Sequence, residues 1–142
     1  MKRIFLALAI LLALGNTADA KNYITLESPA GNTIVDETGK WILGPYKDLH
    51  VNYIGDFGKR YAYASFYDNN QKRYINLNSM VYLPAGYDYE FSYEYAQALT
   101  KDGFKLVKSD GTYAINDVVS AYYYCSDNLI YGKKGEFWYL YN

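Results

Sequence analysis

The sequence has very few of the residues that stabilise or catalyse through sulfur and imidazole. Cys125 is the only cysteine and His50 the only histidine, so the chain cannot form an internal disulfide or supply a Cys and His zinc site. A nucleophilic serine or cysteine would depend on this one histidine, and neither a G-x-S-x-G sequence nor a D-x-[DN]-x-[DN]-G calcium loop occurs. We therefore expect no metal, no cofactor and no enzymatic activity. Cys125 is predicted to be a small core residue, because it follows a tyrosine at a repeat position where the other units have Ala62 and Ala96, and His50 is predicted to be a surface residue.

The sequence also lacks an excess of charge of either sign. Its 14 Lys and Arg residues face 15 Asp and Glu residues, for a formal net charge of −1. Nucleic-acid binding needs concentrated positive charge, and attraction to an anionic membrane surface needs basic clusters. No basic run is longer than two residues. We therefore expect neither a nucleic-acid partner nor an electrostatic membrane-surface role.

Long apolar runs are missing except at the N-terminus. Residues 4–14 are an unbroken apolar stretch that follows a basic Lys2-Arg3 start and precedes Ala18-Asp19-Ala20. This order is typical of a secretory signal peptide, and the stretch is too short to span a bilayer. We predict a signal peptide at residues 1–20, cleaved to leave one domain at 21–142. The protein is then secreted or periplasmic, with no stable membrane insertion after cleavage.

Aromatic residues are what the sequence has in abundance, with 19 tyrosines among its 142 residues. Tyr buries a large ring while its hydroxyl reaches water or a carbonyl, which suits a pleated, partly exposed sheet. Residues 61–67 alternate, with Tyr63 on one face and Ala62 and Phe66 on the other. Further strands are predicted at 73–77, 93–100, 104–108, 122–126, 128–131 and 137–141. No stretch reads as a long amphipathic helix, so we predict an all-β fold.

Turn dipeptides recur at a nearly constant spacing. Asp102-Gly103 and Asp110-Gly111 are strong hairpin signals, because Asx-Gly reaches positive φ at least cost. Weaker counterparts at Asn69-Asn70 and Asn78-Ser79 lie 33 and 32 residues earlier (70 to 103, 79 to 111), and Lys134-Gly135 closes the series 32 residues after Gly103. We interpret this spacing as about three degenerate repeats, although coincidental spacing in a Tyr-rich β domain is the alternative. The units are residues 34–75, 76–107 and 108–142.

These repeats predict antiparallel β-hairpin or meander units. A unit of this size cannot bury its apolar face alone and must pack against its neighbours. We therefore expect one small twisted sheet, a roll or a short solenoid.

The same marks resemble the bacterial Trp-Gly (WG) repeat family. The resemblance covers residues 32–142 and rests on Gly39-Lys40-Trp41, on Tyr74-Ile75-Asn76, on Tyr87-Asp88 and on Asp102-Gly103. No Trp-Gly dipeptide itself occurs. The resemblance implies an all-β repeat, and it carries no catalytic motif because the family is not tied to one reaction. A second, local resemblance, at residues 135–141, is to the aromatic hairpins of choline-binding repeats.

The carboxylates of residues 88–94 are the one candidate for catalysis. Glycosidase chemistry needs two carboxylates around a sugar, and Asp88, Glu90 and Glu94 could be placed on one strand face. A small carboxylate-dependent hydrolase is therefore an alternative function. Asp88 also has an explanation as a repeat position, and Glu94 as an ordinary solvent-facing charge.

The aromatic surface is the favoured functional candidate. Tyr123 must face away from its two neighbours in a strand, and residues 137–141 also place rings on both faces. Exposed rings suit sugar faces, extended peptides or another protein's apolar patch, whereas the plainer interpretation is that they pack a thin domain. The residues predicted to bind a ligand are Tyr122, Tyr124, Trp138, Tyr139 and Tyr141.

We therefore expect an exported, non-enzymatic repeat protein that binds a protein, peptide or glycan at the bacterial envelope. A self-assembling structural protein is a further alternative, because open repeat arrays expose strand edges that invite pairing with another chain.

Overall fold

The described chain is built from β-strands. The computed structural model describes residues 21–56, 59–92, 95–126 and 129–142, and each regular element in these ranges is a strand. The prediction of an all-β fold is confirmed. The predicted signal peptide lies outside the described residues. None of the described ranges contains a helix that could cross a membrane.

The strands form four antiparallel sheets, each made of consecutive strands joined by hairpins. Sheet A contains β1 (Tyr23–Leu26), β2 (Asn32–Asp36) and β3 (Trp41–Tyr46). Sheet B contains β4 (His50–Asp56), β5 (Lys59–Asp68), β6 (Gln71–Asn76) and β7 (Val81–Tyr82). Sheet C contains β8 (Tyr89–Ser92), β9 (Tyr95–Thr100), β10 (Gly103–Lys108) and β11 (Tyr113–Val119). Sheet D contains β12 (Ala121–Ser126), β13 (Leu129–Lys134) and β14 (Phe137–Tyr141).

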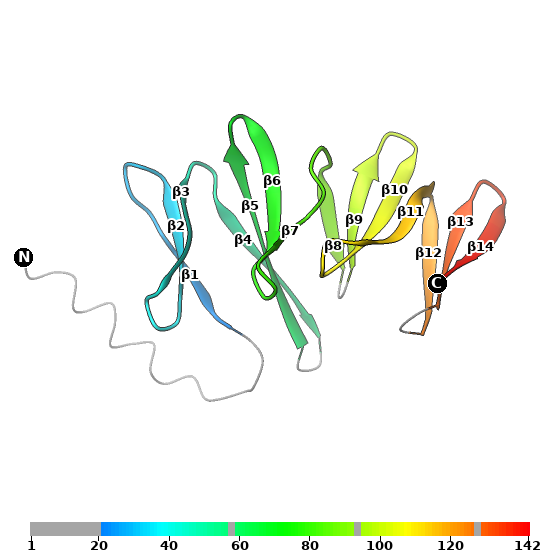
Figure 1. Cartoon of the computed structure of the whole chain (residues 1–142), viewed down its shortest axis with the longest axis horizontal. Helices are drawn as coiled ribbons and strands as arrows, with labels where there is room; N and C mark the ends of the chain where they lie inside the picture. The colour runs from blue at the N-terminus through cyan, green and yellow to red at the C-terminus, as the bar shows by residue number, and fades with distance from the viewer. Residues whose placement is uncertain (1–20, 57–58, 93–94, 127–128) are drawn as a thin grey trace, which may run out of the picture.

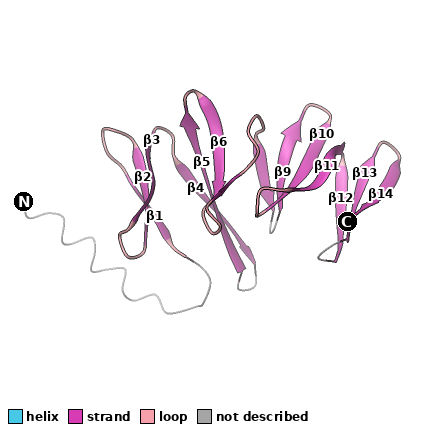
Figure 2. Ribbon diagram, in the orientation of Figure 1, coloured by secondary structure: helices cyan, strands magenta, loops and turns pink. Residues whose placement is uncertain are grey.

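The four sheets follow one another in a row from sheet A to sheet D (Figure 1), and short loops connect their strands (Figure 2). Three apolar cores lie between successive sheets. The core between sheets A and B includes Ile34, Leu43, Ala64, Phe66 and Ile75. The core between sheets B and C includes Tyr63, Tyr74, Tyr89, Ala96 and Val107. The core between sheets C and D includes Tyr95, Leu106, Ile115, Val119 and Ile130.

Each sheet therefore has two distinct faces. We call the face that looks toward the next sheet along the chain the forward face, and the opposite one the rear face. Alternation along β5 places Tyr63 in the forward core of sheet B and Ala64 in its rear core. Sheets B and C are covered on both faces, whereas sheets A and D take part in only one core each.

Sheets A and C repeat the same hairpins 72 residues apart. Ser28 Oγ donates a hydrogen bond to the carbonyl of Gly31, as Thr100 Oγ1 does to that of Gly103. The register repeats as well: Ile34 pairs with Leu43, and Leu106 pairs with Ile115. Both ladders shift register on either side of that pair, so the bulges also coincide. The two sheets are structural copies.

Sheets B and D follow the same plan as sheet C. Each has a two-residue hairpin, closed by the pairs Asp68–Gln71 in sheet B, Thr100–Gly103 in sheet C and Lys134–Phe137 in sheet D. We label the strands of a complete sheet a, b, c and d in chain order. Sheets B and C have all four strands, sheet A has b to d, and sheet D has a to c.

The sheet boundaries differ from the boundaries of the three predicted units. The predicted divisions at 75/76 and 107/108 fall inside β6 and β10, and the structure has four sheets. The regular turns near 70, 103 and 135 are present, but each one joins strands b and c in the middle of a sheet. A period measured between such turns gives the repeat length and not the point where one sheet ends.

Candidate binding surface

The forward face of sheet D is the one sheet face at the C-terminal end of the row, and no described segment packs on it as a further sheet (Figure 1). Most of its side chains are nevertheless apolar. The equivalent positions of the other sheets explain why this matters, because they form the cores between sheets.

The central position of strand c shows the contrast most clearly. It is buried on the forward face of the first three sheets, and its side chain there is fully covered in two of them. In sheet D the same position holds Leu140, whose side chain is 54% exposed. The four equivalent residues are Ile34, Tyr74, Leu106 and Leu140. Sheet D keeps a core residue where the described chain provides no core.

Strand b gives the same result at the forward-facing position five residues before the pair that closes the hairpin to strand c. Tyrosine fills it in sheets A, B and C, and is buried each time. Leu129 fills it in sheet D and is exposed. The four equivalent residues are Tyr23, Tyr63, Tyr95 and Leu129.

Three aromatic residues extend this apolar surface. The ladder aligns Tyr123, Tyr131 and Leu140 in one row across the three strands, and Trp138 lies in the next row opposite Lys133. Directly opposed residues on one face are close enough for their side chains to touch. All members are exposed. We define the terminal patch as Tyr123, Leu129, Tyr131, Trp138 and Leu140.

Of the five residues predicted to bind a ligand, only Trp138 belongs to the terminal patch. The ladder places Tyr122, Tyr124, Tyr139 and Tyr141 on the opposite, rear face of sheet D, because each pairs in the register of Ile130 or Gly132. The structure thus brings these four together on one face and separates Trp138 from them.

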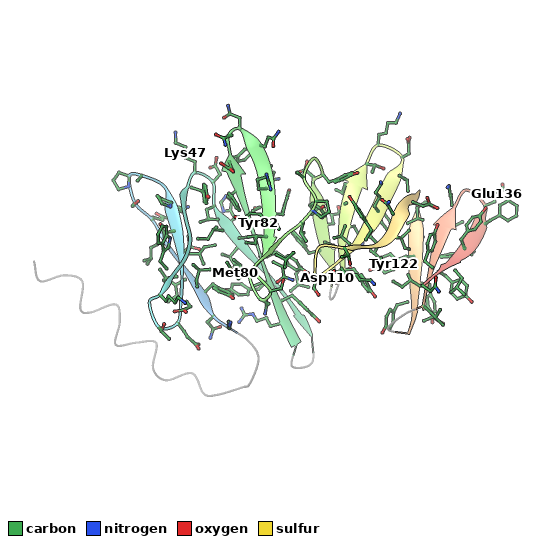
Figure 3. All side chains as sticks on the ribbon, in the orientation of Figure 1. Lys47, Met80, Tyr82, Asp110, Tyr122 and Glu136 are labelled. Carbon is green, nitrogen blue, oxygen red and sulfur yellow. The ribbon has the colours of Figure 1, made fainter. Side chains whose placement is uncertain are left out.

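Two of the rear-face tyrosines are structural. Tyr122 packs edge-on against Phe104 at 5.9 Å between ring centroids, and its hydroxyl lies 2.8 Å from Ser92 Oγ. Figure 3 shows Tyr122 between sheets C and D. Tyr141 Oη donates to Asp117 Oδ2 at 3.1 Å, and its pKa is raised by partial burial first and by the carboxylate second. Both side chains fasten sheet D to sheet C.

Tyr124 and Tyr139 lie at the exposed margin of the same face. The Tyr124 ring is 6.5 Å from that of Tyr95, and Tyr139 pairs with Gly132. Both side chains are exposed despite facing sheet C.

Tyr123, Leu129, Tyr131 and Leu140 were not predicted from the sequence as ligand-binding residues. The alternation of side chains along a strand does indicate a second face, because Tyr123 has to face away from Tyr122, and Leu140 from Tyr141. Only the comparison between sheets shows that the Leu140 face is the uncovered one.

Of the carboxylates considered for catalysis, the structure describes Asp88 and Glu90. Asp88 Oδ1 accepts hydrogen bonds from Tyr74 Oη at 2.8 Å and from Lys72 Nζ at 3.0 Å. These bonds, that of Tyr74 first, lower the pKa of Asp88. The pKa of Lys72 is raised by its hydrogen bond with Tyr74 first and by that with Asp88 second. Glu90 is exposed, and Glu94 lies outside the described residues. Asp88 is thus an ionised link between sheets B and C.

Cys125 corrects one expectation. It is exposed, whereas Ala62 and Ala96, which share its spacing in the sequence, are buried. The two alanines lie in strand b, and Cys125 lies in strand a of sheet D, so the spacing does not reflect equivalent positions. His50 is exposed, as predicted. Among the described residues, no three His, Cys, Asp or Glu side chains group closely enough to hold a metal ion.

Comparisons with protein-family models, with curated proteins and with solved structures find no match for this chain.

Proposed function

We propose that this chain is an exported, non-enzymatic repeat protein of the bacterial envelope that binds an apolar protein surface through the terminal patch. The observation that carries the proposal is the exposure of Leu129 and Leu140 at positions that are buried in the other three sheets. Contiguous exposed apolar patches mark interaction sites in soluble proteins.

The make-up of the patch favours a protein partner over a glycan. Trp and Tyr rings serve both kinds of ligand, but Leu129 and Leu140 add aliphatic surface between them. Aliphatic surface gains free energy chiefly by being removed from water, whereas a sugar needs polar groups around the ring it stacks on. Lys133 is the one charged side chain that the ladder places within the patch rows.

The proposals that the protein is exported and that it is related to the Trp-Gly repeat family rest on the sequence. The apolar stretch at 4–14 and the Ala18-Asp19-Ala20 site support secretion. The stacked meanders are compatible with the resemblance to Trp-Gly repeats, which supplies no activity. The carboxylate hydrolase has less support, because Asp88 serves a structural link.

The test is capture by immobilised exported protein, offered solubilised envelope proteins and, separately, isolated peptidoglycan. The variant replaces Trp138 and Leu140 together by Ser, and Tyr67→Ser is the matched control, because Tyr67 is an exposed aromatic residue of sheet B. Loss of two central apolar contacts should weaken protein capture more than about 10-fold, while the control captures normally. Equal capture by the double variant, or capture of peptidoglycan alone, would contradict the proposal.

A further inference from the structure

The opposite end of the molecule carries a second uncovered apolar face. The rear face of sheet A precedes the first core, and the ladder places Ile24, Val35 and Trp41 in one row across it, with Leu26 two residues from Ile24 on the same strand. Trp41 is 63% exposed and Leu26 is 50% exposed, whereas Ile24 is half-buried and Val35 is buried. The only two tryptophans of the chain thus lie on its two terminal faces.

These residues occupy positions that are core elsewhere. The equivalents of Ile24 on the rear faces of the other sheets are Ala64, Ala96 and Ile130. The equivalents of Leu26 are Phe66, Ala98 and Gly132, and those of Val35 are Ile75, Val107 and Tyr141. Apart from the partly buried Tyr141, all of them are buried against the forward face of the preceding sheet. The rear face of sheet A therefore has the residues of a stacking face but no preceding sheet among the described residues.

We propose that the terminal patch of one molecule docks on the rear face of sheet A of a second copy, so that the row of sheets continues from molecule to molecule. This inference rests on the proposed function and names its partner. The molecule already makes the same kind of contact three times, always between a forward face and a rear face. A second copy allows the same pairing, because its rear face of sheet A can receive the forward face of sheet D of the first copy.

The internal cores define which residues meet. In the core between sheets C and D, Leu106 of strand c clusters with Ile130 of strand b and is flanked by Tyr141 of strand c. The corresponding contact between copies places Leu140 against Ile24 of the second molecule, in the row that also holds the buried Val35 and the exposed Trp41.

The arrangement has a consequence for assembly. Solenoid proteins stay soluble and monomeric by ending in repeats with a polar outer face, and neither end of this row is polar. A contact between two different surfaces is heterologous and does not close by itself, so it builds linear chains of molecules. Each linear chain of molecules would retain one free terminal patch at one end and one free rear face of sheet A at the other.

The test is sedimentation velocity of the exported protein with two single variants, each blocking one end. Leu140→Asp places a charge in the terminal patch, and Leu26→Asp places one on the rear face of sheet A; Tyr67→Ser is the control. We expect the mass of the wild type and of the control to rise with concentration, and each end variant to remain monomeric. An equal mixture of the two variants should form a heterodimer and stop, because each supplies one intact face. That recovery also shows that both variants are folded.

Other outcomes overturn the inference in distinguishable ways. Wild type that stays monomeric up to about 1 mM, where even a weak association is detected, removes the second copy as the partner. If Leu140→Asp then also loses envelope capture, the proposed function stands without self-association. Self-association that persists in Leu26→Asp but not in Leu140→Asp means that two terminal patches meet each other, which contradicts the heterologous contact. Failure of both self-association and patch-dependent capture defeats the proposed function as well.

Discussion

At the scale of single residues, tyrosine hydroxyls link one sheet to the next. Tyr23 Oη of sheet A donates to the Leu77 carbonyl at 2.7 Å, and Tyr74 Oη of sheet B donates to Asp88. Each ring fills a core while its hydroxyl crosses the gap between sheets, which explains why the chain uses Tyr where Leu or Phe would supply the apolar area alone. Tyr63 is the exception: its ring is fully buried, and its hydroxyl has no hydrogen-bond partner among the described residues.

Tyr63→Phe should stabilise the protein. Burial raises the pKa of Tyr63 to about 12, and its ring stacks on Phe91 at 4.2 Å. Phe keeps this stack and removes a buried hydroxyl whose desolvation costs about 1 kcal/mol. Urea unfolding followed by circular dichroism should give a higher midpoint for the variant. A loss of more than about 1 kcal/mol would show that the hydroxyl is satisfied.

Asp88→Asn should remove one source of acid sensitivity. The folded pKa of Asp88 lies below its ordinary value, so its contribution is complete above the ordinary carboxyl range and is lost as the pH falls through the folded pKa. The ion pair with Lys72 is largely exposed, which limits the contribution at neutral pH to about 1 kcal/mol or less. The wild type should therefore have the larger free energy of unfolding at pH 7, and this difference from the variant should shrink near pH 3. A constant difference between them would count against the link.

Residue-scale prediction from the sequence succeeded where alternation within one strand was sufficient. The faces of Tyr63 and Phe66 follow from alternation alone, and they lie in separate cores. Cys125 was misplaced, because its equivalence with Ala62 rested on a spacing between different strands of the sheet. The terminal patch was missed because exposure depends on which sheet has no successor.

At the scale of the element, the hairpins fix where each strand begins. Asn69 and Asn70 both have positive φ, as the sequence predicted for a tight hairpin, and the turn at Asp110-Gly111 joins β10 to β11. The sequence analysis did not identify β4, although Val51 and Ile54 contribute to cores on opposite faces. A strand that contributes apolar side chains to cores on both faces loses the alternation of apolar and polar residues that identifies a strand with one solvent-facing side.

Gly103→Ala should destabilise the hairpin between β9 and β10. A Cβ at this glycine would lie 2.3 Å from the Val119 carbonyl oxygen, and the backbone φ of +149° is unfavourable for other residues. We expect a loss of about 2 kcal/mol or more, because the clash and the strain combine.

Gly86→Ala is the matched control for this change. Gly86 has a φ of +90°, but no atom lies within 4 Å of a Cβ placed there. Only the strain of about 1 kcal/mol should remain. Thermal unfolding of both variants separates the two costs, and equal losses would contradict the close contact at Val119.

At the scale of the whole molecule, the protein is a row of four meanders in which every internal sheet face is paired. The sequence predicted the repeat and the all-β class from its turns and tyrosines. It did not predict four sheets, because among the described residues sheet A has no strand a and sheet D has no strand d, and because the regular turns lie inside the sheets. The two unpaired faces at the ends of the row follow from this count, and the proposed self-association follows from those faces.

The fluorescence of the two tryptophans tests this account most directly. Trp41 and Trp138 lie on the two terminal faces, and both are at least half exposed in the single molecule. In the exported protein, emission should move to shorter wavelength as concentration rises, because docking removes both rings from water. The shift should persist in Trp41→Phe, where Trp138 alone reports, and disappear in Leu26→Asp. Emission that stays at the wavelength of exposed tryptophan at every concentration would contradict the docking of one end on the other.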